Sequence, residues 1–272
     1  MVMGAYGGDP AAYLKALGEA GDGPHDIARA ALMLAALDHT RIPRSSYEAH
    51  LNAIAEAAGA AVRAGQPPLD AVTAVAQMMT GQFGYDGDRT HYDAAENADL
   101  MAVIDRRRGL PVALGILYIH AARAAGCVAE GLASPGHFLL RVIRDGHALL
   151  IDPFNSGAVL EPERLGGPLS VAAVQAEAVS DTDVLLRLQN NIRLRALQAD
   201  DRPRAVEIAR RMVLIAPRRA DLWIELARHY ESTSSLGAAK TAYESGLALA
   251  GEGTALHNEA ALALHALKRR LN

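Results

Sequence analysis

A histidine and an aspartate that flank a short apolar hairpin are the residues of this sequence best placed to do chemistry. His137 follows Ser134-Pro-Gly and opens one apolar run, and Asp152 ends a second apolar run beyond the dipeptide Asp145-Gly146. Two apolar runs around Asp-Gly predict a β-hairpin. Antiparallel pairing brings the start of one strand beside the end of the next, so we expect the imidazole and the carboxylate to be neighbours. In such a pair the carboxylate orients the histidine to act as the base for a nucleophile.

The nucleophile for such a base is expected at a helix N-terminus, where the helix dipole lowers the pKa of a thiol. The helix that could present it begins at Gly109-Leu110-Pro111, because proline is favoured in a first turn, and it ends at Gly126. Between Asp99 and Cys127 the sequence has no Cys, Ser or Thr. Cys127, the single cysteine, follows the end of this helix, ~20 Å from its start at 1.5 Å per residue. We therefore expect Cys127 to be a buried structural thiol.

Helices and strands in three regions would position these residues. Residues 1–81 form a helical N-terminal region, in which proline-containing breaks near 43 and 67 separate amphipathic helices. Residues 82–180 begin with a loop rich in glycine and aspartate, continue with helices near 98–107 and 112–125, and end with the hairpin. Helices followed by antiparallel strands are typical of an α+β fold. Residues 181–272 are expected to be all-helical.

The helical region 181–272 contains an internal repeat. Pro217 and Gly251 end successive units, and Ala205 and Ala239 occupy equivalent positions within them. The members of each pair are ~34 residues apart, which is the period of tetratricopeptide repeats. Seven residues match the consensus spacing: Trp223, Leu226, Ala227, Tyr230, Ala239, Tyr243 and Gly246. We predict two repeats and a capping helix over 256–271, with an ordinary helical extension as the alternative.

Composition excludes several classes of function. Lys and Arg number 27 against 31 Asp and Glu, a net charge of −4 that argues against nucleic-acid binding. The basic cluster Arg106-Arg107-Arg108 has no aromatic neighbours in the sequence. We interpret it as a set of positive charges that complement the helix dipole at a helix C-terminus. One cysteine excludes an internal disulfide framework and any multi-cysteine zinc site. The run Leu110 to Ile119 is half of the ~20 residues that cross a bilayer, and residues 1–25 lack a secretory pattern. We expect a cytoplasmic protein with no cofactor, no membrane association and no nucleic-acid partner.

Several motifs, taken in order along the chain, resemble the transglutaminase-like superfamily. The resemblance is closest to its bacterial SirB-type branch, in which such a domain is joined to tetratricopeptide repeats. It covers about 82–272, and residues 25–81 take the place of that branch's helical leader. The motifs are Phe83 to Asp88 with Tyr92-Asp93, Asn97, Arg107 to Pro111, Gly136-His137-Phe138 and Asp152 to Asn155. The resemblance implies a papain-like α+β core with a helical N-terminal leader and a C-terminal all-α tetratricopeptide-like region.

Active members of this superfamily use a Cys-His-Asp triad to hydrolyse or cross-link glutamine side chains or to cleave peptide bonds. By resemblance, His137 matches the triad histidine and Asp152 the triad aspartate. The cysteine position falls at Pro111 or beside it, where the sequence has no Cys, Ser or Thr. The resemblance therefore implies a protein without catalytic activity, acting in protein interaction or regulation through its repeats and a degenerate cleft.

Binding residues follow from the same interpretation, and two alternatives stay open. Asn155 and Arg141 are expected to line the cleft, and Trp223 and Tyr230 to bind a protein or peptide partner. The first alternative is an amidohydrolase or acyl-transfer enzyme that uses the His137–Asp152 pair. The second is a small-ligand or metal-binding module joined by His120 or His147, although these histidines lack the spacing of zinc motifs, and we assign no metal ligand.

Overall fold

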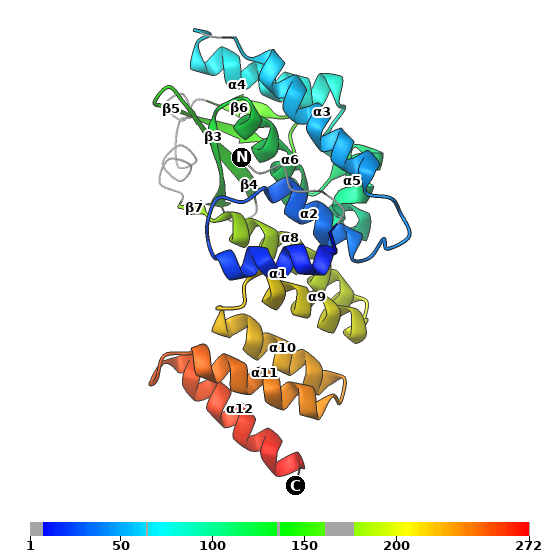
Figure 1. Ribbon diagram of the computed structural model, residues 1–272, viewed down its shortest axis with the longest axis vertical. Helices are drawn as coiled ribbons and strands as arrows, with labels where there is room; N and C mark the ends of the chain where they lie inside the picture. The colour runs from blue at the N-terminus through cyan, green and yellow to red at the C-terminus, as the bar shows by residue number, and fades with distance from the viewer. Residues whose placement is uncertain (1–7, 64, 135–136, 161–176, 272) are drawn as a thin grey trace. The chain divides into compact units, whose positions relative to one another are not determined.

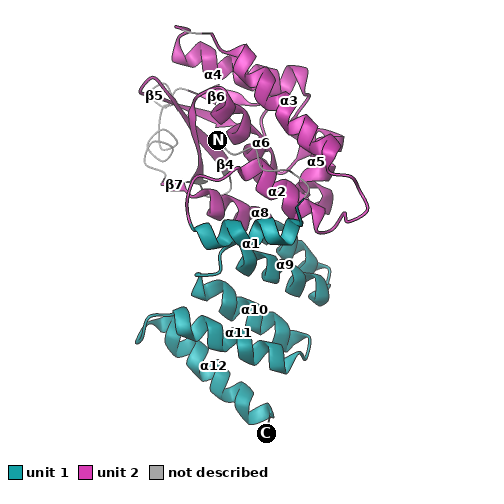
Figure 2. Ribbon diagram, viewed as in Figure 1, with its two compact units in different colours: residues 1–21, 189–272 teal, residues 22–188 magenta. Residues whose placement is uncertain are grey.

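The structure is a computed structural model that describes residues 8–63, 65–134, 137–160 and 177–271 (Figure 1). The side chains of residues 133, 134 and 137 lie outside this description. The chain divides into two compact units, residues 22–188 and residues 1–21 with 189–272 (Figure 2). Within the described ranges, no helix is long and apolar enough to span a membrane.

One helix, α6 (Pro111–Ala124), forms the centre of the unit 22–188. Its residues from Val112 to Ile119 are all buried, as expected of a helix that is apolar on every side. The helices around it are α2 (Ile27–Ala36), α3 (Ser45–Ala61), α4 (Pro68–Gln77) and α5 (Leu100–Arg106). A π-helical turn, η1 (Met78–Gln82), extends α4, and a 3-10 turn, η2 (Ala95–Ala98), precedes α5. The first residue of α6 is the proline that the sequence predicts at its start.

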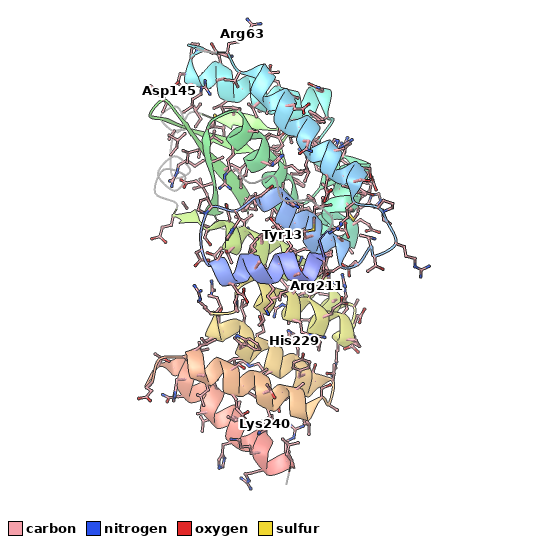
Figure 3. The ribbon with its side chains drawn as sticks, in the orientation of Figure 1. Tyr13, Arg63, Asp145, Arg211, His229 and Lys240 are labelled. Carbon is pink, nitrogen blue, oxygen red and sulfur yellow. The ribbon has the colours of Figure 1, made fainter. Side chains whose placement is uncertain are left out.

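An antiparallel sheet packs on α6 through strands β3 and β4. Its order is β6-β5-β4-β3-β7, with β3 (Val128–Ser134), β4 (His137–Arg144), β5 (His147–Asp152), β6 (Ala158–Leu160) and β7 (Ala178–Val179). The predicted hairpin is confirmed, because β4 pairs with β5 from Leu140–Ile151 to Arg144–His147. Its turn at Asp145 (Figure 3) has positive φ angles of 48° and 80° at Asp145 and Gly146, as a two-residue type I′ turn requires. A second, parallel pairing joins β1 (Asp86–Gly87) to β2 (Arg108–Gly109).

Contact between α6 and β4 depends on the absence of a side chain at Gly115. A Cβ atom there would lie 2.7 Å from Cδ1 of Phe138, whose ring is buried. We expect Gly115→Ala to lower the free energy of unfolding by about 1–3 kcal/mol, although glycine-to-alanine changes in helices ordinarily stabilise by up to ~1 kcal/mol. The matched control is Gly59→Ala in α3, where the nearest atom would be 3.9 Å away and the expected change is stabilising. Urea denaturation of both variants checks the opposite signs.

The other unit consists of helices that pack mainly on their neighbours in the chain. They are α1 (Pro10–Ala20), the end of α8 (Asp181–Gln198), α9 (Arg202–Ile215), α10 (Ala220–Ser232), α11 (Leu236–Leu249) and α12 (Ala255–Leu271). Helix α11 begins and ends one tetratricopeptide period after α9, and α10 ends one period after α8. Ala205 and Ala239, which are separated by the same interval, are both fully buried. The helical boundaries therefore recur with the period read from the sequence.

Candidate functional site

The start of α6 offers no reactive side chain. Pro111 is partly exposed, and the two residues that follow it, Val112 and Ala113, are apolar and buried. Two backbone hydrogen bonds hold the chain just before this turn, from Leu110 N–H to the carbonyl oxygen of Asn97 (2.9 Å) and from Asp88 N–H to that of Gly109 (3.3 Å). The position where the resemblance implies a nucleophile is thus well anchored, and it carries no thiol or hydroxyl.

A buried polar network around Asn97 provides this anchoring. The Asn97 side chain is fully buried, donates to the carbonyl oxygen of His91 (2.6 Å) and accepts from Arg106 (3.0 Å). Arg106 also donates to Asp88 (2.6 Å), whose other carboxylate oxygen accepts the backbone N–H of His91 (2.9 Å). This backbone hydrogen bond, together with Arg106 and Asn97, outweighs burial and lowers the pKa of Asp88. Through Asn97, which also accepts the backbone N–H of Leu110, the network holds the loop after β1 next to the residue that precedes α6.

A second cluster joins the loop Phe83–Tyr85 to α3 through Arg107. The Arg107 backbone is left-handed (φ 57°), and its guanidinium donates to Tyr85 Oη (2.7 Å) and lies 2.5 Å from His50 Nε2. His50 Nε2 is also 2.8 Å from Tyr85 Oη. Burial, followed by the charge of Arg107, lowers the pKa of His50 to about 4, so its imidazole is neutral at pH 7. Burial raises the pKa of Tyr85 to about 12. At pH 7 the cluster therefore consists of a neutral histidine and a neutral tyrosine in contact with the positively charged Arg107.

The low pKa of His50 predicts a loss of stability in mild acid. Because the unfolded chain protonates His50 near pH 6.5 and the folded chain only near pH 4, the unfolded state takes up the extra proton as the pH falls. After allowance for partial exposure, we expect the free energy of unfolding to drop by about 1–2 kcal/mol between these values. His50→Gln should remove that part of the drop, whereas His147→Gln, at an exposed position, should leave it unchanged. Urea denaturation at pH 7 and pH 4.5 measures both, and equal pH dependence in the two variants would contradict the assignment.

Asp152 terminates the hairpin by closing the turn that follows it. One carboxylate oxygen accepts the backbone N–H groups of Phe154 (3.1 Å) and Asn155 (3.2 Å), and the other accepts the Asn155 side-chain amide (2.6 Å). Asn155 is exposed and also accepts a hydrogen bond from Arg89 (3.1 Å). The structure thus brings together Asp152 and Asn155, two of the residues that the sequence singles out.

The loop after β1 lies against this turn. Arg89 donates to Asp86 (3.1 Å) and to the carbonyl oxygen of Phe154 (2.8 Å), and Asp86 accepts the backbone N–H of Ser156 (3.1 Å). Burial raises the pKa of Asp86, but hydrogen bonds from the Gly87 N–H and from Arg89 outweigh it, and the pKa is lowered. A Cβ atom at Gly87 would lie 2.5 Å from the Phe154 ring. The absence of a side chain at Gly87 therefore lets the loop after β1 pack directly on the turn that follows the hairpin.

Tyr118 is a buried polar residue near Asp86 and Asp152 that the sequence did not single out. Its side chain is fully buried in α6, and its hydroxyl has no hydrogen-bond partner among the described residues. Burial raises its pKa, and the nearby carboxylates of Asp86 and Asp152 raise it further. A Cβ atom at Gly157, whose φ is 62°, would lie 2.5 Å from this hydroxyl. A tyrosine within an apolar helix is typical of a core, so no pattern in the sequence marked it.

For His137, the histidine of the predicted pair, the structure describes the backbone but not the side chain. His137 opens β4 opposite Ser134. The β4–β5 pairing ends with Leu140 opposite Ile151. When the same register is extended by one residue, Leu139 lies opposite Asp152. Position 137, two residues before Leu139, is then a diagonal neighbour of Asp152. Arg141, expected in the same cleft, forms an ion pair with Glu130 across the β3–β4 ladder (2.5 Å).

The remaining candidates lie apart from one another. His120 on α6 is 2.9 Å from the carbonyl oxygen of Leu51, and His147 is exposed at the start of β5. No group of three or more His, Cys, Asp or Glu among the described residues is placed to hold a metal ion. Cys127 follows the end of α6 and is 7% exposed, and its sulfur lies 4.0 Å from an Arg144 nitrogen. The single thiol is therefore at the opposite end of α6 from Pro111.

Comparison with known proteins identifies the family. The family model of the transglutaminase-like superfamily matches residues 45–195, which run from α3 into α8. A UPF0162 protein of Xylella fastidiosa is 29% identical over 161 residues, covering 55% of this chain and 57% of that protein. A UPF0162 protein of Pseudomonas aeruginosa is 31% identical over 128 residues, covering 44% of this chain and 47% of that protein. Mouse F-box only protein 21 is 32% identical over 135 residues, covering 46% of this chain and 21% of that protein. The matches thus span about half the length of the bacterial relatives. No solved structure matches the chain. On the evidence of the family match and of the helix, hairpin and loop motifs that the fold brings together, this chain belongs to the transglutaminase-like superfamily.

Proposed function

We propose that this protein is a non-catalytic member of the superfamily, of the SirB-type branch, and that it acts in protein interaction or regulation. The observation that carries the proposal is the first turn of α6. Its residues Pro111, Val112 and Ala113 have no nucleophilic atom, and the single thiol, Cys127, is buried at the other end of the helix. Acyl transfer by the Cys-His-Asp mechanism begins with nucleophilic attack, so without that group the reaction has no first step.

The bonding of Asp152 supports the same proposal. Its carboxylate oxygens accept three hydrogen bonds from the turn that it closes, two from backbone N–H groups and one from Asn155. These bonds give the aspartate a structural role in closing the turn. Residues 82–180 then form the degenerate transglutaminase-like domain, preceded by a helical region over 1–81.

The interaction role rests on the helices of 181–272. Their boundaries recur with the tetratricopeptide period and small residues are buried at equivalent positions, which supports a pair of tetratricopeptide-like repeats. Stacked helical hairpins of this kind present extended surfaces that bind peptides or helices. Trp223 and Tyr230 are both partly exposed on α10, as residues that bind a partner should be.

Turnover assays on the full chain test the absence of catalysis. We expect no amine incorporation into glutamine-containing substrates and no peptide hydrolysis by the wild type. Activity that His137→Ala and Asp152→Ala abolish would replace the proposal with the amidohydrolase or acyl-transfer alternative.

Affinity capture with the immobilised full chain tests the interaction role. A partner should be retained by the wild type and by Asp152→Ala, and its recovery should fall with Tyr230→Ala. Equal recovery by all three proteins, or none by the wild type, would argue against binding through the repeats.

A further inference from the structure

A groove of about 320 Å³ lies between α1, α9 and α10, within the unit that contains the repeats. Its walls are largely apolar and aromatic, with Val213 from α9 and Trp223, Leu226 and Tyr230 from α10. The volume lies at the lower end of the ~300–1,000 Å³ typical of ligand pockets. The groove therefore has room for a few side chains of a bound segment.

An internal hydrogen bond and a close helix contact hold two parts of this groove in place. The indole Nε1–H of Trp223 donates to the carbonyl oxygen of Pro217 (2.8 Å), which sets the orientation of the ring. Helix α1 packs closely on α9 at Gly18, where a Cβ atom would meet the backbone of Leu214 and lie 2.9 Å from Cδ of Pro217. A tryptophan ring that is already oriented lowers the entropic cost of binding, because that side chain does not have to be ordered.

Cations outnumber carboxylates among the residues that line the groove. Arg210 is exposed and has no ion pair or hydrogen bond within the described part of the chain. The adjacent Arg211 (Figure 3) differs, because it is buried and paired with Glu207. Lys15 lies 3.8 Å from Glu19 with both side chains well exposed, a pair of little strength. The groove thus offers apolar walls beside one unpaired and one weakly paired positive charge.

We propose that this groove binds a peptide segment in which an apolar side chain is flanked by acidic residues. The apolar side chain enters between Trp223 and Tyr230, and the acidic residues pair with Arg210 and Lys15. Complementary charge sets the preference among segments, since a basic segment would face like charges at the rim. This inference rests on the proposed interaction function and assigns to it a surface and a class of partner.

The emission of Trp223, the only tryptophan of the chain, provides a direct measure of binding. The full chain is titrated with two decapeptides of equal length and identical apolar centre, one flanked by glutamates and the other by lysines. The acidic peptide should shift Trp223 emission saturably, and the basic peptide should bind at least about tenfold more weakly. Raising the salt concentration should reduce this difference.

Two pairs of variants identify the groove as the site. Arg210→Glu should reverse the preference between the peptides, whereas Arg269→Glu, the same charge change on α12, should not. Tyr230→Ala should weaken binding at least about tenfold, and Tyr230→Phe, which keeps the ring, should not. Thermal melting confirms that each variant is folded.

Three results would overturn the inference: no saturable shift with either peptide, equal affinity for both, or the same behaviour of Arg210→Glu and Arg269→Glu. Failure of the proposed function would look different, because it would show as enzymatic turnover or as loss of all partner binding. An absence of peptide binding in a protein that still captures a partner would contradict only the assignment of the groove.

Discussion

Replacing Asp88 with alanine is expected to lower the free energy of unfolding by about 3 kcal/mol, the largest loss we predict for a single polar side chain. The Asp88 side chain is almost fully buried, and its removal leaves the Arg106 guanidinium without its carboxylate partner. It also removes the acceptor of the His91 backbone N–H. Urea denaturation measures the loss. Asp22→Ala, at an exposed aspartate, is the matched control and should change the free energy by less than about 0.5 kcal/mol.

The same network predicts the behaviour of Asp88 in acid. Because its pKa is lower in the folded than in the unfolded chain, its stabilising contribution is present above the ordinary value of 3.8 and is lost as the pH falls through the folded pKa. Asp88→Asn keeps the shape of the side chain without the charge, so its stability should fall less than that of the wild type below pH 3.8. A similar loss in Asp88→Ala and Asp22→Ala would show that the network does not anchor α6.

Placing a thiol at the start of α6 is expected to produce the second large effect. In a Cys127→Ser background, Pro111→Cys should give a thiol whose pKa is well below the usual ~8.5, because the helix N-terminus stabilises the thiolate. At pH 6.5 it should be alkylated at least about tenfold faster than Cys127 of the wild type. Iodoacetamide reaction rates measured against pH give both quantities.

A second thiol, placed at an exposed position away from any helix terminus, distinguishes the effect of the helix N-terminus on the thiol pKa from the effect of solvent exposure. Asn52 is exposed in the middle of α3, so Asn52→Cys in the same background should react with an ordinary thiol pKa. If the thiols at 111 and 52 titrated alike, the start of α6 would not be the activating position that the family mechanism requires. Adding His137→Ala to Pro111→Cys shows in addition whether position 137 influences that thiol.

Local signals explain which elements could be predicted from the sequence. The β4–β5 turn needs two positive φ angles, and Asp145-Gly146 is a residue pair that adopts them readily. Helix α6 begins at a proline, and the chain leaves it through Gly126 at φ 79°, so both ends are marked by residue type. Asp152 and Asn155 adjoin because both belong to the turn that ends the hairpin.

Contacts between distant segments could not be predicted in the same way. The parallel pairing of β1 with β2 involves two residues from each strand, too few to leave a periodic pattern. Asp88, Asn97 and Arg106 form one network, yet they lie in a loop, a 3-10 turn and a helix with no common spacing. The packing of α1 on α9 depends on Gly18, an isolated glycine in a helix that the sequence does not link to the repeats.

The alkylation rate of Cys127 tests most directly the claim that the protein has no catalytic thiol. It is measured from about pH 5 to pH 9 on the folded wild type, on His137→Ala and on the chain unfolded in urea. We predict slow labelling of both folded proteins at every pH and fast labelling in urea, because Cys127 is buried at the far end of α6. Fast labelling of the folded wild type that persists below pH 7 and disappears in His137→Ala would show a thiolate paired with that imidazole. The protein would then be an active cysteine enzyme.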